Sequence, residues 1–341
     1  LKNLAEPPLV SVIMANYNGA DHLAMALRSV LAQSVGHIEI LLLDDASSDD
    51  SIKVARGVAD TDPRVRIFET SRNAGPGAAR NRGFEMATGR WIAIVDSDDI
   101  IHPCRLERMT TAGDALETDA VADDLTYFHD ASIRPAGTLM GTNRPEKPAG
   151  LSATCFVSAD PNAPQLGYLK PLIRRTALSG LRYREDIKIG EDHDLYVRFL
   201  LNGGRMHLLP QSYYLYRRHN SSLSYRMHPD DVAAIISAQD DLLSDYPDLS
   251  DGMLDHMALR RAALQRPLAF ETLVQEIRGR HFGRAMGQLV HRPSLLPQLV
   301  KVGKSRLARA FVRPRNASAV IARDPSEWTL QDWSVMLEKT M

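Results

Sequence analysis

Residues 90–100, RWIAIVDSDDI, run from a short apolar segment directly into three carboxylates within four positions. The apolar half has the composition of a buried β-strand. The acidic half, formed by Asp96, Asp98 and Asp99, crowds like charges together. At about 5 Å and an effective dielectric constant near 20, each pair of charges costs roughly 3 kcal/mol unless positive charge neutralises it. The stretch therefore predicts a strand whose carboxyl end needs a cation nearby.

Three similar strands precede this one along the chain. LVSVIMANYN (9–18) is followed by apolar residues at helical spacing, HIEILLLDDASSDD (37–50) by a helix expected at 51–59, and RVRIFET (64–70) by a glycine-containing loop entering a helix. Nearly continuous apolar strands that alternate with helices predict an α/β fold, Rossmann-like, with a mostly parallel central sheet and helices on both faces. Ligands bind such sheets at the carboxyl ends of the strands, where these polar clusters lie.

The pattern changes after about residue 115. Strands are expected near 119–128 and 205–216, with a helix near 191–202 and a Pro/Gly-rich loop at 134–150. From 229 the pattern is helical, interrupted at Pro247, Pro293 and Pro297. We therefore predict a first domain at 1–228 and an α-helical C-terminal region at 229–341.

The composition of the 341-residue chain is that of an ordinary globular protein, with 44% hydrophobic and 24% charged residues. No apolar run approaches 18 residues, so no membrane-spanning helix is expected. The visible start, LKNLAEPP, lacks the apolar core of a signal peptide. Two cysteines, Cys104 and Cys155, make no disulfide framework. A reducing cytoplasm is therefore the expected location.

Charge is unevenly distributed along the chain. The formal net charge is −1, yet residues 277–323 contain eleven Lys or Arg and no Asp or Glu, against 30 basic and 42 acidic residues elsewhere. One interpretation is a solvated surface or an interface with an acidic part of this or a neighbouring chain. The favoured one is a peripheral contact with an anionic membrane, where each basic residue contributes about 1 kcal/mol. Nucleic acid is disfavoured, because few aromatic residues interleave with the basic ones. Apolar residues suited to shallow insertion are Phe282, Leu289, Leu295, Leu296, Leu299, Val300, Leu307 and Phe311.

The glycine-rich segment GPGAARNRG (75–83) fails the test for a dinucleotide fingerprint. The sixth position, counted from Gly75 and Gly77, is Arg80, where close packing of helix and strand requires Gly or Ala. No suitably placed acid follows to hold a ribose. A Rossmann oxidoreductase is therefore disfavoured.

The acidic trio has two interpretations. Asp and Ser form turns well, so a solvated turn after the strand explains the composition. Alternatively, hard oxygen ligands on a rigid strand suit Mg²⁺ or Mn²⁺, which bind substrate phosphates alongside one or two carboxylates. The strand that holds the trio favours the metal site.

Two later segments also carry candidate chemistry. In IGEDHDLYVRFLLNGG (189–204), Glu191 and Asp192 open a helix, either as capping residues worth about 1 kcal/mol or as a positioned general base. In YLYRRHNSSLS (214–224), two arginines and three serines flank His219. A single histidine is usually structural or exposed, but arginines and serines together are typical of anion binding.

In this order, these segments resemble the family 2 inverting glycosyltransferases of the GT-A fold. The resemblance covers roughly residues 8–225 and rests on ANYN, LLLDDASSDD, NAGPGAARNRG, DSDD, GED and YRRHNSSLS. One such motif is weak, but six in the correct order are specific. The helical remainder is less diagnostic, but the overall arrangement is similar to that of bacterial enzymes that build exopolysaccharide, capsule or O-antigen.

The resemblance implies a role for each matching residue. Tyr17 would stack on uracil, Asp45 would accept a hydrogen bond from its N3–H, and Asp192 would be the catalytic base with Glu191 beside it. Ala15 stands where the family often has Thr or Val, so it would offer only backbone contacts. The implied nucleotide-sugar residues are Ala15, Tyr17, Asp45, Asn73, Arg80, Asp96 and Ser97. The implied metal ligands are Asp98, Asp99 and His219, and the implied diphosphate or acceptor contacts are Arg217, Arg218 and Ser222.

The sequence thus predicts a metal-dependent enzyme using Mn²⁺ or Mg²⁺. It would move a sugar from a UDP-sugar to a hydroxyl of a saccharide acceptor, linked to a polyprenyl diphosphate at the inner face of the cell membrane. In one inverting displacement, Asp192 would take the acceptor proton as UDP leaves from the opposite face. The alternative is a nucleotide-sugar-binding protein without turnover. A nucleotidyltransferase is disfavoured, because no glycine- and lysine-rich triphosphate loop lies near the first strand.

Overall fold

The chain divides into two compact units. The computed structural model describes residues 6–129, 135–160, 162–218 and 228–296. Within these ranges, the first unit comprises 6–156 and 160–218, and the second comprises 157–159 and 228–296. The boundary predicted near residue 228 adjoins the start of the first helix of the second unit.

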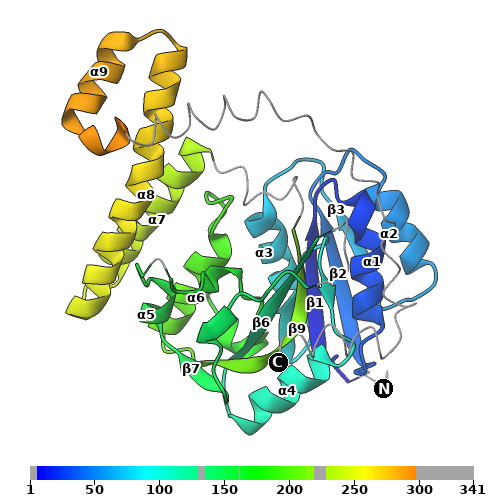
Figure 1. Ribbon diagram of the computed structural model, residues 1–341. Helices are drawn as coiled ribbons and strands as arrows, with labels where there is room; N and C mark the ends of the chain where they lie inside the picture. The colour runs from blue at the N-terminus through cyan, green and yellow to red at the C-terminus, as the bar shows by residue number, and fades with distance from the viewer. Residues whose placement is uncertain (1–5, 130–134, 161, 219–227, 297–341) are drawn as a thin grey trace. The chain divides into compact units, whose positions relative to one another are not determined.

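The first unit contains a nine-stranded sheet surrounded by helices (Figure 1). The strands are β1 (Val10–Asn16), β2 (Ile38–Asp44), β3 (Val65–Glu69), β4 (Trp91–Ile94), β5 (Ile100–Ile101), β6 (Ala120–His129), β7 (Ala149–Leu151), β8 (Leu172–Arg174) and β9 (Met206–Arg218). The helices are α1 (Ala20–Leu31), α2 (Ser51–Ala59), α3 (Pro76–Met86), α4 (Arg105–Ala115), α5 (Ala153–Phe156) and α6 (Glu191–Leu201), with short 3₁₀ turns at Gly141–Asn143, Leu166–Tyr168 and Arg175–Leu178.

The strand order is β3-β2-β1-β4-β8-β6-β9-β5, and β7 also pairs with β9. Strands β3, β2, β1 and β4 are parallel to one another, and the β6–β9 pair is also parallel. The short strands β5, β7 and β8 run antiparallel to theirs. Because β1, β2 and β4 are adjacent and parallel, their carboxyl ends meet at one edge of the sheet.

Helices cover both faces of the parallel strands. Buried residues of α1, α2 and α4 pack with one face of β1, which includes Val12 and Met14. On the opposite face α3 approaches β1 so closely that a Cβ on Gly83 would lie 2.5 Å from Ile13 Cγ2. Glycine is required at this contact because any side chain would push the helix off the sheet. The predicted α/β class, with helices on both faces and a helical C-terminal part, is confirmed.

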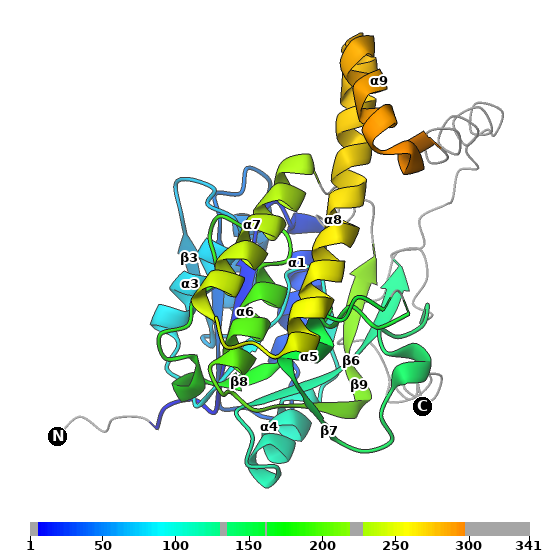
Figure 2. The ribbon, with the colours of Figure 1, turned by 90° about the vertical axis from the view of Figure 1, so that its left-hand side faces the viewer.

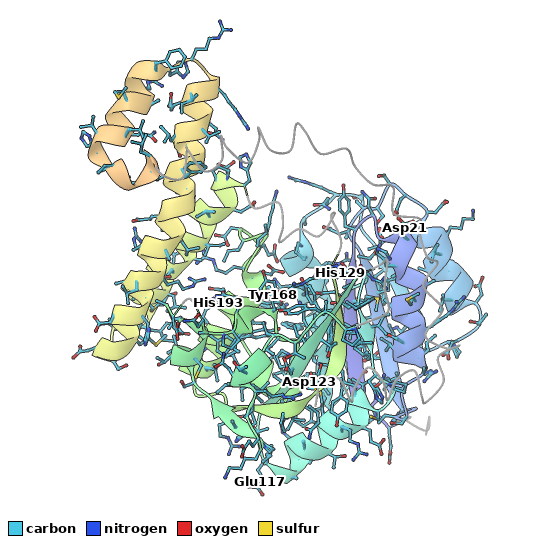
Figure 3. All side chains as sticks on the ribbon, in the orientation of Figure 1. Asp21, Glu117, Asp123, His129, Tyr168 and His193 are labelled. Carbon is cyan, nitrogen blue, oxygen red and sulfur yellow. The ribbon has the colours of Figure 1, made fainter. Side chains whose placement is uncertain are left out.

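A buried ion pair lies inside this unit. The guanidinium of Arg105, in α4, donates to Asp123 Oδ1 over 2.9 Å, and both side chains are fully buried. Asp123 lies within β6 and is labelled in Figure 3. Asp123 Oδ2 also accepts the backbone N–H of Tyr213 over 3.0 Å. The pair therefore links α4 to two neighbouring strands of the sheet.

The second unit is helical, with α7 (Pro229–Asp245), α8 (Asp251–Arg278), α9 (Phe282–His291) and a 3₁₀ turn at Pro293–Leu295. Figure 2 shows α7 and α9 each lying along part of the long α8. Helix α7 begins at Pro229 with a capping box between His228 and Asp231. Among the helices within the described ranges, none has the length and hydropathy needed to cross a bilayer.

Candidate active site

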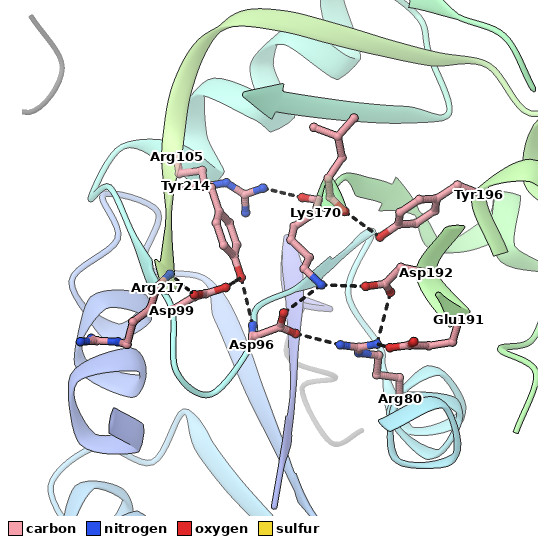
Figure 4. A network of polar contacts seen from close by, with 11 residues as sticks. Arg80, Asp96, Asp99, Arg105, Lys170, Glu191, Asp192, Tyr196, Tyr214 and Arg217 are labelled. Carbon is pink, nitrogen blue, oxygen red and sulfur yellow. Dashed lines mark hydrogen bonds and ion pairs between the residues drawn. The ribbon is translucent and has the colours of Figure 1, made fainter. Parts of the chain in front are cut away.

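Two buried cations, Lys170 and Arg80, join the carboxylates of Asp96 and Asp192 (Figure 4). The ammonium nitrogen Nζ of Lys170 lies 2.8 Å from Asp96 Oδ2 and 2.7 Å from Asp192 Oδ2. The guanidinium of Arg80 donates to Asp96 Oδ1 over 2.8 Å, to Asp192 Oδ1 over 3.2 Å and to Glu191 Oε1 over 2.6 Å. Each aspartate therefore has one oxygen on Lys170 and the other on Arg80. The network brings the start of α6 against the end of β4.

The start of α6 explains why these acids point toward the cations. Gly190, in the left-handed region at φ 87°, occupies the N-cap position, so neither Glu191 nor Asp192 is the N-cap residue. Both acids lie in the first turn, where the helix dipole favours negative charge. Capping alone therefore does not account for the pair, because their oxygens bind Arg80 and Lys170.

Three carboxylates share two cations in this cluster, and the pKa values reflect the imbalance. Burial favours the neutral form of Asp96, but Lys170 and Arg80 outweigh it and lower its pKa to about 2. Burial and the charge of Asp192 raise the pKa of Glu191 above its ordinary value, although Arg80 opposes the shift. Asp96 is thus ionised at neutral pH, and Glu191 is a carboxyl whose ionised form the cluster disfavours.

Lys170 is the residue that sequence reasoning missed. It precedes β8, and the antiparallel pairing of Leu172 with Ala93 brings the residues before β8 beside the end of β4. Two buried side chains hold this part of the backbone. Arg105 donates a hydrogen bond to the Lys170 carbonyl, and the Tyr196 hydroxyl donates one to the Leu169 carbonyl. In the sequence, Lys170 is one lysine in GYLKPLIRR (167–175), and no motif distinguishes it.

A second cluster surrounds Asp99 at the far end of the acidic trio. The Tyr214 hydroxyl donates to Asp99 Oδ2 over 2.8 Å and accepts the backbone N–H of Asp96 over 3.1 Å. The backbone N–H of Arg217 donates to Asp99 Oδ1 over 2.7 Å. Burial, followed by the charges of Asp98 and Asp96, raises the pKa of Asp99 well above its ordinary value. Burial and the two neighbouring carboxylates therefore both disfavour the ionised form of Asp99.

The acidic trio fits a divalent cation. One oxygen from each of Asp96, Asp98 and Asp99 lies within 4.8 Å of the other two. Such a group of hard oxygen ligands suits Mg²⁺ or Mn²⁺, and a cation would offset the charge that raises the pKa of Asp99. Asp98 is half-buried, whereas Asp99 is only 1% exposed, so Asp98 is the more accessible ligand.

Asp45 and Asn73, predicted to contact the nucleotide, shape the loop between β3 and α3. Asp45 Oδ2 accepts the backbone N–H of Gly75 over 2.7 Å, and both carboxylate oxygens accept that of Ala74 over 3.0 Å. The Asn73 amide donates to the Asp45 carbonyl over 3.2 Å. The carboxylate thus fixes the loop that leads into α3, and its contact with a base stays a prediction.

The other predicted nucleotide residues lie at the same edge of the sheet. Tyr17, directly after β1, is 54% exposed, and Ala15 and Ser97 are half-buried. A Cβ on Gly19 would lie 2.3 Å from Asn16 Oδ1 and 3.3 Å from Ser97 Oγ. Only glycine permits the loop after β1 to approach the acidic trio this closely.

The two arginines at the end of β9 contact other residues of the first unit. Arg217 is buried, its Nε donates to the Asp98 carbonyl over 2.6 Å, and its guanidinium lies 4.6 Å from the centroid of the Phe128 ring. The Arg218 guanidinium lies 3.6 Å from the centroid of the Tyr127 ring. Arg217 therefore supports the acidic trio, and contact of either arginine with a diphosphate stays a prediction. His219 and Ser222 lie outside the described residues.

A mostly parallel sheet with an acidic turn after β4, and an acidic helix start held against that turn, is the arrangement that the resemblance to GT-A glycosyltransferases implied. The family model for glycosyl transferase family 2 matches residues 11–150. The succinoglycan biosynthesis protein ExoO of Rhizobium meliloti (strain 1021) is 33% identical over 322 residues, 92% of this chain and 90% of that protein. The chain belongs to glycosyl transferase family 2, so the resemblance found in the sequence is confirmed.

Solved structures share the fold at low identity. S. aureus TarS 1–349 in complex with UDP-GlcNAc has a TM-score of 0.58 and 20% identity, covering 76% of this chain and 70% of that one. The mannosyltransferase PcManGT from Pyrobaculum calidifontis, in complex with GDP-Man and Mn²⁺, has a TM-score of 0.53 and 16% identity, covering 85% and 82%. At these identities the likeness extends to the fold and not to the substrate.

Proposed function

We infer that this enzyme transfers a sugar, with inversion, from a UDP-sugar to a hydroxyl group of a saccharide acceptor. The observation that carries the proposal is the placement of the Asp192 carboxylate against Asp96, with Lys170 and Arg80 between them. A general base must lie within reach of a donor bound at the acidic turn. The network supports this placement of the base with side chains from α3, the turn after β4, the segment before β8 and α6.

The proposed reaction is a single displacement. One Asp192 oxygen accepts the proton of the acceptor hydroxyl while that oxygen bonds to the anomeric carbon. The bond between the anomeric carbon and the diphosphate oxygen breaks, and its electron pair leaves with UDP. Each Asp192 oxygen accepts one contact from a cation, which leaves a lone pair for the proton. Glu191 orients Arg80, and through it the base.

Asp98 and Asp99 are the residues we assign to Mn²⁺ or Mg²⁺, with His219 as a further candidate. The ion, when bound, stabilises the negative charge that develops on the departing diphosphate. Asp96 is assigned to the ribose or the sugar, and Tyr17 and Asp45 to the base. Ala15, Asn73 and Ser97 are assigned to the nucleotide-sugar site, Asn73 by shaping its loop. Arg218 and Ser222 remain candidates for the diphosphate or acceptor. For Arg80, the observed contacts favour support of the carboxylates over direct contact with the donor. For Arg217, they favour support of the acidic turn, since its Nε donates to the Asp98 carbonyl.

The names of similar proteins support the substrate class. ExoO is named for succinoglycan biosynthesis, TarS is described in complex with UDP-GlcNAc, and PcManGT in complex with GDP-Man and Mn²⁺. We therefore propose that the acceptor is a growing polysaccharide linked to a polyprenyl diphosphate. The basic region at 277–323 favours work at the inner, anionic face of the cell membrane, with the enzyme in the cytoplasm.

A screen of nucleotide sugars tests the proposal. Thermal unfolding is followed with each UDP- and GDP-sugar in the presence of Mn²⁺ or Mg²⁺, and release of the free nucleotide is measured with oligosaccharide acceptors. One UDP-sugar should raise Tm beyond UDP alone and should release UDP only when an acceptor is present. Binding without release in any combination would favour the alternative, a nucleotide-sugar-binding protein without turnover.

Replacing Asp98 should weaken metal-dependent nucleotide binding. With Asp98→Ala, the affinity for UDP in Mn²⁺, measured by calorimetry, should fall by at least about tenfold, because loss of even an outer partner of a metal site costs that much. Without metal, the variant and the wild type should bind UDP equally. Asp60→Ala, at the exposed end of α2, is the matched control. An unchanged affinity in Mn²⁺ would remove Asp98 from the metal site.

A further inference from the structure

Helix α9 carries a row of exposed apolar side chains. Phe282, Met286 and Val290 are exposed by 64%, 61% and 70%, whereas large apolar side chains in a folded unit are usually buried. They are spaced four residues apart, so they lie along one face of the helix. We call these three residues the α9 stripe.

A different side of α9 already provides its packing contacts. Ala285 is buried in one apolar cluster with Ala269 and Leu273 of α8, and Leu289 packs against the same cluster. Figures 1 and 2 show α9 folded back along the end of α8. The contacts that hold this helical hairpin together therefore do not use the α9 stripe. An apolar row beyond what packing requires is typical of a surface that binds something.

Positive charge accompanies the α9 stripe. Between residues 277 and 296 the chain has no Asp or Glu, and it has Arg278, Arg280, Arg284 and Arg292. The carboxylate of the preceding acid, Glu276, contacts residues of this basic segment. It lies 2.9 Å from His281 Nδ1 and 3.9 Å from Arg284 Nη1. The partner of this surface is therefore expected to be apolar and negatively charged.

We propose that the α9 stripe is the insertion surface for an anionic lipid bilayer. Phe282, Met286 and Val290 enter the boundary of the acyl chains while the arginines bind lipid phosphates, as in an amphipathic helix lying in the membrane plane. A second copy of the chain fits less well, because residues 277–296 contain four arginines and no acid to complement them. The inference rests on the membrane association proposed above and assigns it to three side chains.

Vesicle flotation of the full chain tests the inference. The variant Phe282→Ser/Val290→Ser removes two exposed side chains of the α9 stripe. The matched control, Leu254→Ser/Leu259→Ser, removes two exposed apolar side chains of α8. With phosphatidylglycerol-rich vesicles at low salt, the wild type and the control should float, and the stripe variant should partition at least about tenfold less. With pure phosphatidylcholine, or at high salt, wild-type flotation should fall because the arginines lose their contribution.

The possible failures are distinguishable. If the stripe variant floats like the wild type, the α9 stripe is not the insertion surface. If the wild type does not float on anionic vesicles even at low salt, membrane association itself fails. A self-associating wild type whose stripe variant is monomeric by ultracentrifugation would assign the surface to a second copy and overturn the inference. Binding of UDP in Mn²⁺, measured on the same preparations, reports separately on the proposed transferase site.

Discussion

Asp192→Asn should abolish most sugar transfer while leaving donor binding largely intact. The carboxamide has nearly the shape of the carboxylate but cannot take a proton from the acceptor hydroxyl. General bases contribute about 10²–10⁴-fold, so kcat with the donor identified by the screen should fall by at least about 10²-fold. UDP affinity in Mn²⁺ should change little, because the residues assigned to the nucleotide sugar, together with Asp98 and Asp99, lie in β1 or in the loops after β1, β2, β3 and β4 and not on α6.

The control for this variant is Asp186→Asn. The Asp186 side chain is 60% exposed and pairs with Arg184, so it offers the same chemical change outside the network. Its kcat should match the wild type. Turnover of Asp192→Asn close to wild type would remove Asp192 as the base. Equal loss of UDP binding and of turnover would indicate instead that the change disrupts the whole cluster through Arg80 and Lys170.

Many elements of the fold could be predicted because each contains a continuous apolar run or apolar residues at helical spacing. The apolar runs of β1, β2 and β4 and the helix expected at 51–59 are confirmed in the structure. Strands β5, β7 and β8 could not be predicted, since two or three residues contain no recognisable period. Only the structure therefore reveals these short strands and their antiparallel direction.

The residues of the candidate site also fall into those that could be predicted from the sequence and those that could not. Asp96, Glu191 and Asp192 could be recognised because acids at the end of a strand and the start of a helix are local patterns. The positive charge that compensates Asp96 could not be predicted from the sequence. It comes from Arg80, 16 positions earlier, and from Lys170, whose position depends on the register of β8. The sequence predicted a metal ion as the compensation for the trio, and the structure adds two cations of the protein itself at Asp96.

Lys170→Met should lower both activity and stability, because it removes one of two cations from three carboxylates. Loss of one partner from a buried ion pair costs about 3–5 kcal/mol, and Lys170 Nζ contacts Asp96 and Asp192 with its side chain only 5% exposed. We expect the free energy of unfolding to fall by about 3 kcal/mol. We expect kcat to fall by about 10²-fold, since Asp192 loses the contact that sets its orientation. Denaturant unfolding and steady-state kinetics measure the two effects.

A purely structural lysine and one that positions the base differ in further readouts. If Lys170 positions the base, Lys170→Met should lower kcat more than it weakens UDP binding, and the acidic limb of the pH profile should move to higher pH because Arg80 alone now balances the carboxylates. Lys170→Arg keeps the charge and should retain more activity than Lys170→Met. Lys53→Met, at an exposed position of α2, should match the wild type. A loss of stability with an unchanged kcat and pH profile in the folded fraction would make Lys170 a structural residue alone.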